Sequence, residues 1–363
     1  MNDEVAVYGA GAYGRVFARA LEARGRRVAL FIDQYAPERQ RHGLPVLRAA
    51  EVEDRTMTVY LSVAQPPQGA TGRSAIEAQL AAAGFTRVVG FEAALRAFPA
   101  ILDGLLELGL LWMRGGPGHW LDYPMLRQVE ALLSDCQSTG LLERVVRFRE
   151  RPRVSSYISP DGRQAYFPDD IDLFRGIDAL RMADCGGYDG DTLLQVARLA
   201  GNRLPGLEYV ISFEPDPENY RRLAQAAGEA RERWPRARFI ASPLGVWSET
   251  TLLNFDAAGS SSSALSGQGA TRVPVVALDA MLGGARPNYI KMDIEGAEGE
   301  ALHGARRLIA GQAPVLAICL YHRPHDLWEI PLLVRRLQPA YRFYLRTHGH
   351  MCLDTVLYCV PER

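Results

Sequence analysis

The residues best suited to chemistry form one glycine-rich stretch, Asp184-Cys185-Gly186-Gly187-Tyr188-Asp189-Gly190-Asp191-Thr192, which follows an apolar run and precedes a helical pattern. Glycines let the backbone turn tightly and leave room for a ligand against bare main chain. The helix that follows points its free N–H groups at such a ligand. The residues expected to contact the ligand from this stretch are Asp184, Gly186, Gly187, Tyr188, Asp189, Gly190 and Thr192.

A second acid indicates what kind of ligand this is. The predicted strand Tyr209–Phe213 ends in Glu214, 30 positions after Asp184 (214 − 184). A carboxylate at the end of the second strand accepts hydrogen bonds from both hydroxyls of a ribose. No lysine follows the glycines, so a P-loop is excluded. The combination predicts an adenosine ligand without a pyrophosphate, such as S-adenosylmethionine, with Asn219 near the ribose and Ser242 near the adenine. The alternative is an ordinary strand–turn–helix with surface acids.

Two further predicted strands end in polar residues that could react. Asp293 and Glu295 follow the fourth strand, and His322 and His325 follow the fifth. Ligands of an open α/β sheet bind outside the carboxyl ends of its strands, so these side chains should lie near the reacting centre. A histidine has an unperturbed pKa near 6.5, which suits a general base acting on a hydroxyl. We therefore expect His322 or His325 to be the base, with Asp293 holding the methionine end of the cofactor or orienting the base.

A divalent metal at this position is the alternative to a metal-free base. Its ligands would be Asp293, Glu295 and one of the two histidines. Because a histidine among carboxylates suits Mg²⁺ only weakly, we expect no metal.

The alternation of apolar strand-like segments with helical patterns around these residues predicts an α/β fold with a Rossmann-like, seven-stranded sheet. The last two predicted strands, Tyr341–Arg346 and Thr355–Val360, are closely spaced around His348-Gly349-His350. A final antiparallel hairpin on a parallel sheet distinguishes the class I methyltransferase sheet from the sheet of a dehydrogenase.

A second glycine-rich turn lies near the N-terminus. The strand Val5–Tyr8 leads into Gly9-Ala10-Gly11-Ala12-Tyr13-Gly14, and the next strand ends in Asp33, 19 positions after Gly14 (33 − 14). This spacing satisfies the dinucleotide-binding fingerprint. However, the unit ends near Phe98 with only about half of a dinucleotide fold, and no catalytic set follows. The open alternatives are an NAD(P)-dependent oxidoreductase, a nucleotide-sugar-binding module, or a scaffold whose glycines serve only tight packing.

The length of 363 residues predicts two or three domains. We expect a small Rossmann-like domain over residues 1–98, a helical connector or lid over residues 99–165, and the cofactor-binding domain over residues 166–363. This middle segment is expected to be helical because its apolar residues recur at helical spacing.

Composition argues against nucleic acid and membranes as partners and against a secreted location. The formal net charge of −1 favours neither nucleic acid nor an anionic membrane as a partner. Five cysteines without paired spacing indicate reduced thiols in a cytoplasmic protein. No apolar run approaches the roughly 18 residues that span a bilayer, so no membrane insertion is expected. The N-terminus has no basic segment before its apolar stretch, which argues against a signal peptide.

From Tyr166 to about Val360 the sequence resembles the FkbM family of S-adenosylmethionine-dependent methyltransferases. The resemblance is carried by the stretch 184–192, by Phe213-Glu214-Pro215, by Val275-Val276-Ala277-Leu278-Asp279 and by Ile290-Lys291-Met292-Asp293-Ile294-Glu295-Gly296-Ala297-Glu298. It implies O-methylation of a hydroxyl on a sugar, a glycan or a secondary metabolite, so the expected partner is a small-molecule or saccharide acceptor.

The N-terminal segment resembles the small Rossmann-like domain that precedes sugar acyltransferases and some methyltransferases. Its match covers Val5 to about Phe91, through Val7-Tyr8-Gly9-Ala10-Gly11 and Gly43-Leu44-Pro45-Val46-Leu47.

Overall fold

The computed structural model describes residues 4–64, 75–116, 118, 121–200, 204, 206–256, 264–265 and 271–362. The chain divides into two compact units. The N-terminal unit comprises Met1–Leu121, Gly140–Ala165 and Thr347–Thr355, and the C-terminal unit comprises Asp122–Thr139, Tyr166–Arg346 and Val356–Arg363. The segment 99–165, expected to be one connector, is therefore shared between the two units.

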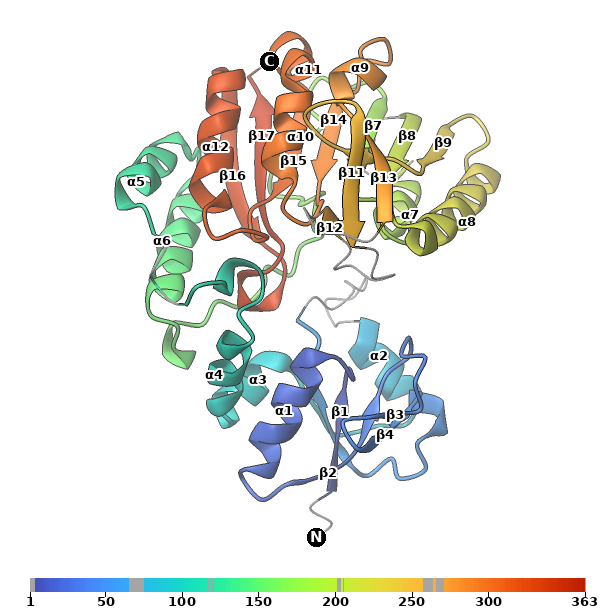
Figure 1. The fold of residues 1–363 in the computed structure, drawn as a ribbon, viewed down its shortest axis with the longest axis vertical. Helices are drawn as coiled ribbons and strands as arrows, with labels where there is room; N and C mark the ends of the chain where they lie inside the picture. Colours follow the sequence, from blue (N-terminus) through green and yellow to red (C-terminus); the bar gives the residue numbers. More distant parts are fainter. Residues whose placement is uncertain are drawn as a thin grey trace. The chain divides into compact units, whose positions relative to one another are not determined.

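The N-terminal unit is built on a six-stranded sheet of order β3-β4-β2-β1-β5-β6 (Figure 1). Its strands are β1 (Glu4–Tyr8), β2 (Arg27–Ile32), β3 (Gln40–Arg41), β4 (Leu44–Leu47), β5 (Thr58–Leu61) and β6 (Val88–Val89). Strand β1 pairs in parallel with β2 and β5, and only β3 runs antiparallel to its neighbour. The sheet is mixed, with a parallel Rossmann-like centre.

Helices and the segment 347–355 complete this unit. Its helices are α1 (Ala12–Glu22), η1 (Ala49–Glu51), α2 (Ala75–Ala82), α3 (Phe91–Ala97), α4 (Ala100–Glu107), η2 (Leu111–Met113), residues 140–150 of α6 (Cys136–Glu150), η3 (Val154–Ser156) and η4 (His350–Cys352). The ring of His350 stacks on Phe91 at 4.5 Å, and its Nδ1 lies 2.9 Å from the Tyr157 hydroxyl. Burial lowers the pKa of His350 to about 4, so this histidine is a neutral packing residue.

The C-terminal unit contains a seven-stranded sheet of order β16-β17-β15-β14-β7-β8-β9. Its strands are β7 (Leu180–Cys185), β8 (Leu207–Phe213), β9 (Arg238–Ser242), β14 (Tyr289–Met292), β15 (Val315–Cys319), β16 (Tyr341–Thr347) and β17 (Thr355–Pro361). Strands β15, β14, β7, β8 and β9 are parallel, whereas β17 runs antiparallel to β15. The predicted mixed sheet with an antiparallel end is confirmed.

Seven helices and a second, smaller sheet surround this sheet in the described residues. The helices are α5 (Tyr123–Leu132), α7 (Asp191–Leu199), α8 (Pro217–Arg233), α9 (Leu278–Met281), α10 (Glu298–Gly304), α11 (Arg306–Gln312) and α12 (Asp326–Leu337). The smaller sheet has the order β10-β13-β11-β12, with β10 (Gly245–Val246), β11 (Thr251–Asp256), β12 (Ala264–Leu265) and β13 (Thr271–Val276). Helix α8 begins where the Asp216 side chain accepts from the N–H groups of Glu218 and Asn219, with Pro217 at its first position.

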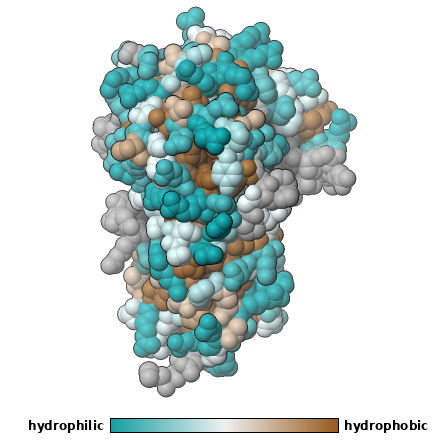
Figure 2. Space-filling view, turned by 90° about the vertical axis from the view of Figure 1, so that its left-hand side faces the viewer, coloured by the Kyte–Doolittle hydropathy of each residue, from teal (hydrophilic) through white to brown (hydrophobic). Residues whose placement is uncertain are grey.

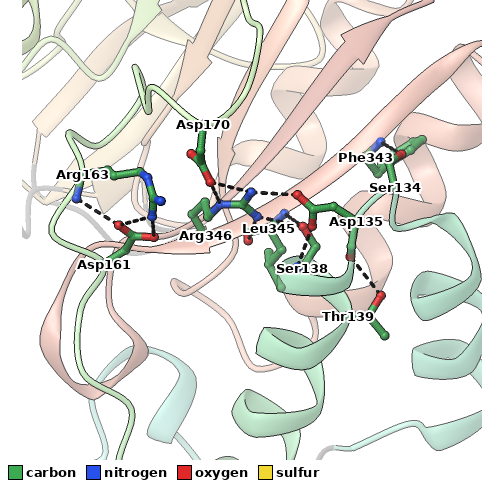
Figure 3. A network of polar contacts seen from close by, with 10 residues as sticks. All are labelled: Ser134, Asp135, Ser138, Thr139, Asp161, Arg163, Asp170, Phe343, Leu345 and Arg346. Carbon is green, nitrogen blue, oxygen red and sulfur yellow. Dashed lines mark hydrogen bonds and ion pairs between the residues drawn. The ribbon is translucent and has the colours of Figure 1, made fainter.

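The buried Arg346 connects two segments of the C-terminal unit to strand β16. These segments, 122–139 and 166–170, lie before and after residues 140–165, which belong to the N-terminal unit. Figure 3 shows Arg346 of β16 between the carboxylates of Asp135 and Asp170, each 2.8 Å away, while its Nη1 donates to the Ser138 hydroxyl. Burial disfavours the arginine charge, but the two carboxylates outweigh this effect and raise the pKa of Arg346. The network explains why residues 122–139 belong to the C-terminal unit.

Hydrophilic residues predominate on the face shown in Figure 2, where apolar residues form separate patches. Among the helices that the structure describes, none combines the length and apolar character needed to cross a bilayer.

Candidate functional site

The first strand of the site, β7, ends in a buried ion pair. Asp184 is 0% exposed and Lys291 is 2% exposed, and their Oδ1 and Nζ atoms lie 3.2 Å apart. The Ser212 hydroxyl donates to the other carboxylate oxygen at 2.8 Å, and the lysine donates to the Gly186 carbonyl at 2.5 Å. Burial disfavours the charge of Lys291, but the carboxylates of Asp184 and Asp293 outweigh it and raise the pKa of the lysine. Asp184 therefore faces the interior and anchors the turn.

The turn after β7 uses glycine for conformation and for close packing. Gly186 and Gly190 have φ angles of +86° and +90°. A Cβ on Gly186 would lie 1.8 Å from the carbonyl oxygen of Asp293, and one on Gly190 would lie 2.4 Å from the Cβ of Ala226. The Gly190 N–H donates to the Gly187 carbonyl at 2.8 Å, which closes the turn. The glycines therefore serve the close packing of this turn against the loop after β14 and against α8.

Glu214 lies at the end of β8, beside this turn. Its Oε2 accepts from the Tyr188 N–H and its Oε1 from the Asp216 N–H, each at 2.9 Å. Burial raises the pKa of Glu214 to about 7, against the lowering effect of the two N–H donors. Each carboxylate oxygen has a further lone pair for a ligand donor. The predicted acid at the end of the second strand is thus next to the glycine turn.

The other residues predicted to bind cofactor surround these two features. Asn219 is buried in the first turn of α8, and Thr192 is buried in the first turn of α7. Ser242 is the last residue of β9, and its carbonyl accepts from the Glu214 N–H at 3.0 Å. Burial, together with Asp191, raises the pKa of Asp189. These residues gather at the carboxyl ends of β7, β8 and β9.

Asp293 is held by two tyrosines at the end of β14. Its Oδ2 accepts from the Tyr166 hydroxyl at 2.7 Å, and its Oδ1 accepts from the Tyr321 hydroxyl at 3.1 Å. The Nε2 of His322 lies 3.2 Å from Oδ1. Burial opposes ionisation, but His322 and Lys291 outweigh it and hold the pKa of Asp293 below its usual range. The side chain retains 23% exposure and remains accessible from the rim.

The structure separates the two candidate histidines. His322 is 2% exposed, with Nδ1 2.8 Å from Glu298 Oε1 and Nε2 3.7 Å from Glu295 Oε2. Burial disfavours its charge, but the surrounding carboxylates raise the pKa of His322 well above its ordinary value. The side chain of His325, by contrast, is 39% exposed at the start of α12, 3.7 Å from Glu329. Only His322 of this pair has a described contact with Asp293.

Sequence reasoning missed four residues of this rim. Tyr166 and Tyr321 position Asp293, and the fully buried Glu298 accepts from the Ile294 N–H at 2.9 Å while facing His322. Burial and the nearby Glu298 raise the pKa of Asp326 to about 7. The spacing of Asp293, Glu295 and Glu298 was the available signal, since three acids follow one buried strand.

The N-terminal glycine turn is organised differently. Asp33 accepts from the Ala10 N–H through Oδ2 and from the Tyr35 N–H through Oδ1, each at 2.9 Å. A Cβ on Gly14 would lie 1.9 Å from the carbonyl oxygen of Gly9. The acid therefore ties the turn to its own strand end, and Gly14 allows helix and strand to approach closely.

Together, the parallel sheet with its antiparallel end and the acids at its strand ends define a class I methyltransferase fold. Residues 184–351 match the methyltransferase FkbM domain, and residues 4–64 match the PglD N-terminal domain. Residues 184–351 thus carry a methyltransferase FkbM domain, and residues 4–64 carry a PglD-type N-terminal domain. Both resemblances expected from the sequence are confirmed.

A solved structure supports the same fold. The chain is similar to the crystal structure of methyltransferase FkbM from Methylobacillus flagellatus KT, with 23% identity and a TM-score of 0.59. The similarity covers 99% of this chain and 90% of that chain. Comparison with curated proteins found no match. None of these similarities indicates the acceptor.

Proposed function

We propose that this protein transfers a methyl group from S-adenosylmethionine to a hydroxyl oxygen of a small-molecule or saccharide acceptor. The observation that carries the proposal is Glu214, a buried carboxylate that follows β8 and lies beside the glycine turn. When bound, S-adenosylmethionine supplies an electrophilic methyl group on a sulfonium, which is a good leaving group.

The residues at the strand ends fit the parts of this cofactor. The free lone pairs of Glu214 suit two ribose hydroxyls, and the buried Asn219 lies in the next turn of chain. Ser242 at the end of β9 is the residue we assign to the adenine. The backbone of Gly186 and Gly187 and the carboxylate of Asp293 suit the methionine end, whose amine is a cation.

The chain has two tasks at the acceptor, positioning and proton removal. Holding two reactants in line can lower the activation barrier by roughly 7–11 kcal/mol. His322 is only 2% exposed and is enclosed by carboxylates, so the more accessible Asp293 is better placed to accept the hydroxyl proton. Its low pKa makes Asp293 a weak base. We therefore expect the positioning of its carboxylate by Tyr166 and Tyr321 to contribute more to the rate than its basicity.

Calorimetry of the full-length protein with S-adenosylmethionine, NAD(H) and a UDP-sugar tests the cofactor. We expect S-adenosylmethionine to bind, and Glu214→Gln to weaken it by roughly 1.5–3 kcal/mol, the scale of a hydrogen bond to a charged group. The matched control is Asp33→Asn, the acid at the same place in the other unit, which should leave this affinity unchanged. Binding of NAD(H) alone, with substrate reduction, would favour the oxidoreductase alternative.

Single-turnover methyl transfer to candidate nucleotide-sugars and other polyhydroxylated acceptors tests the reaction. Asp293→Asn should lower turnover by about 10²–10⁴-fold, the usual contribution of a general base. His325→Gln should turn over at the wild-type rate because this side chain is exposed beside Glu329. If His325→Gln is the slow variant and Asp293→Asn is not, the base belongs to the 321–325 loop instead.

A further inference from the structure

His322 is surrounded by three carboxylates, whereas a general base needs only one such partner. Its Nε2 lies 3.2 Å from Asp293 Oδ1 and 3.7 Å from Glu295 Oε2, and its Nδ1 lies 2.8 Å from Glu298 Oε1. We propose that Asp293, Glu295 and the Nε2 of His322 bind a divalent metal cation, with Glu298 orienting the imidazole.

The distances agree with a shared cation. Ligand atoms about 2.1 Å from one metal and about 90–110° apart lie roughly 3.0–3.5 Å from each other. The two separations from Nε2 are in or just above this range, so small side-chain movements would complete the site.

The two sides of the imidazole have different environments. Asp293 and Glu295 face Nε2, and each side chain is 23% exposed, so a cation there could keep positions open to an acceptor. Glu298 faces Nδ1 and is 0% exposed. Metal-binding histidines commonly donate their second N–H to a carboxylate, which fixes the tautomer and the ring orientation. Glu298 matches that supporting role, and Nε2 is left for the metal.

Buried negative charge around His322 points to a cation. Both ring nitrogens of His322 face carboxylates, at 2.8 Å and 3.2 Å, and within the described residues the buried Oε2 of Glu298 makes no hydrogen bond. Buried polar atoms without such a partner cost free energy. A protonated imidazole would offset only one of the three carboxylates, and Lys291 is already paired with Asp184. A dication at Nε2, with the imidazole neutral, would offset two of the three carboxylates.

The loop after β14 is shaped to place Glu295. Glu295 has a φ of +56° and Gly296 a φ of +96°. A non-glycine residue in this region is strained, and such strain persists where the surrounding structure enforces it. A Cβ on Gly296 would lie 3.7 Å from the Cβ of His322, so the loop passes close to the histidine. This turn brings the Glu295 carboxylate to the Nε2 side.

The donor set selects the metal. One imidazole with two carboxylates suits Mn²⁺, Zn²⁺ or Fe²⁺ better than Mg²⁺, which prefers oxygen ligands alone. Its role rests on the proposed function. A cation at this rim would bind the acceptor oxygen and lower the pKa of its hydroxyl, so that the proton is lost near neutral pH without a strong base.

Titration of the chelator-treated, full-length protein with Mn²⁺, followed by electron paramagnetic resonance of free Mn²⁺, tests the site. We expect one cation per chain, and calorimetry with Zn²⁺ should give the same stoichiometry. Removing a ligand, in Glu295→Gln or Asp293→Asn, should lower affinity the most. Glu298→Gln should lower it by about 10–100-fold, the usual effect of losing a carboxylate behind a metal-binding histidine. The control Glu329→Gln, an exposed acid beside His325, should bind like the wild type.

Two results would overturn the cation site: no binding of Mn²⁺ or Zn²⁺ at millimolar concentration, or wild-type affinity in Glu295→Gln, which is partly exposed and should fold. Calorimetry with S-adenosylmethionine on the same chelator-treated protein separates this inference from the proposed function. Cofactor binding without cation binding removes the metal site alone. Cation binding without cofactor binding supports the metal site and counts against the proposed function.

Discussion

The two units of this chain each carry a glycine-rich turn between a parallel strand and a helix, yet the acids beside the turns differ in burial, since Asp33 is half-buried and Glu214 is buried. In the N-terminal unit, Asp33 accepts backbone N–H groups through both oxygens and holds its own turn. In the C-terminal unit, Glu214 accepts one N–H group on each oxygen and is buried enough for its pKa to rise to about 7.

The glycines themselves do not separate the turns. Gly14 and Gly186 would each place a Cβ within 2 Å of a carbonyl oxygen, at 1.9 and 1.8 Å, so both allow close packing of backbone. What distinguishes the C-terminal turn is buried charge, namely the Asp184–Lys291 pair beneath it and Glu214 beside it. Buried charge is expensive, so its presence at one turn is a better indication of a ligand site than glycine spacing.

The largest expected effect is on the buried pair. Asp184→Asn leaves Lys291 charged and buried without its carboxylate, which should cost about 3–5 kcal/mol in the free energy of unfolding. Asp33→Asn in the other unit should cost far less, because its partners are neutral N–H groups. Urea denaturation of both variants gives the comparison. An equal, small loss in the free energy of unfolding for both variants would show that the C-terminal turn does not depend on buried charge more than the N-terminal turn does.

Next in size is a substitution in the C-terminal turn. Gly186→Ala combines a positive φ with a clash against the Asp293 carbonyl, and should cost about 2–4 kcal/mol. Gly11→Ala is the matched change in the N-terminal turn, where a Cβ would meet nothing within 4 Å. It should cost under about 1 kcal/mol. Thermal unfolding of each variant measures the difference, and a stable Gly186→Ala would contradict the packing described here.

A smaller effect is expected from pH. Because burial raises the pKa of Glu214 to about 7, the carboxyl takes up a proton below that pH and accepts hydrogen bonds less well. S-adenosylmethionine affinity should therefore fall as the pH drops below about 7, and level off at the loss expected for Glu214→Gln, roughly 1.5–3 kcal/mol. Calorimetry between pH 5.5 and 8 on wild type and Glu214→Gln isolates this contribution. A Glu214→Gln profile as steep as that of the wild type would assign the titration to another group.

The same carboxyl affects stability with the opposite sign. Its folded pKa lies above its unfolded value of 4.5, so the folded state binds more protons between about pH 4.5 and 7. The Glu214 contribution to the free energy of unfolding should thus be present at low pH and be lost as the pH rises to about 7.

The smallest effect is expected in the N-terminal turn. We propose that this unit does not use NAD(H) productively, so Gly11→Val should leave methyl transfer unchanged. The fold has room for this side chain, because a Cβ at Gly11 meets nothing within 4 Å. Substrate reduction with NADH that disappears in Gly11→Val would show that this turn is a dinucleotide site and would end the contrast between the turns.

Local sequence determined most of the architecture. Apolar runs that end in Asp184, Glu214 and Asp293 predicted the strands β7, β8 and β14, because a buried parallel strand is a short, continuous apolar segment. Glycine turns and helix starts are also short-range features, so the alternation of strand and helix, the antiparallel end and both family resemblances could be read from residues close in the chain.

Only the tertiary structure decided which distant side chains meet. Tyr166 and Asp293 are 127 positions apart, and Arg346 reaches Asp135 across 211 positions. No local pattern encodes such pairs, since they depend on strand order and register. The choice between His322 and His325, three positions apart in one loop, was decided in the same way. One ring is buried against carboxylates from the end of β14, and the other stays exposed at the start of α12, because the turn between β15 and α12 points them in different directions.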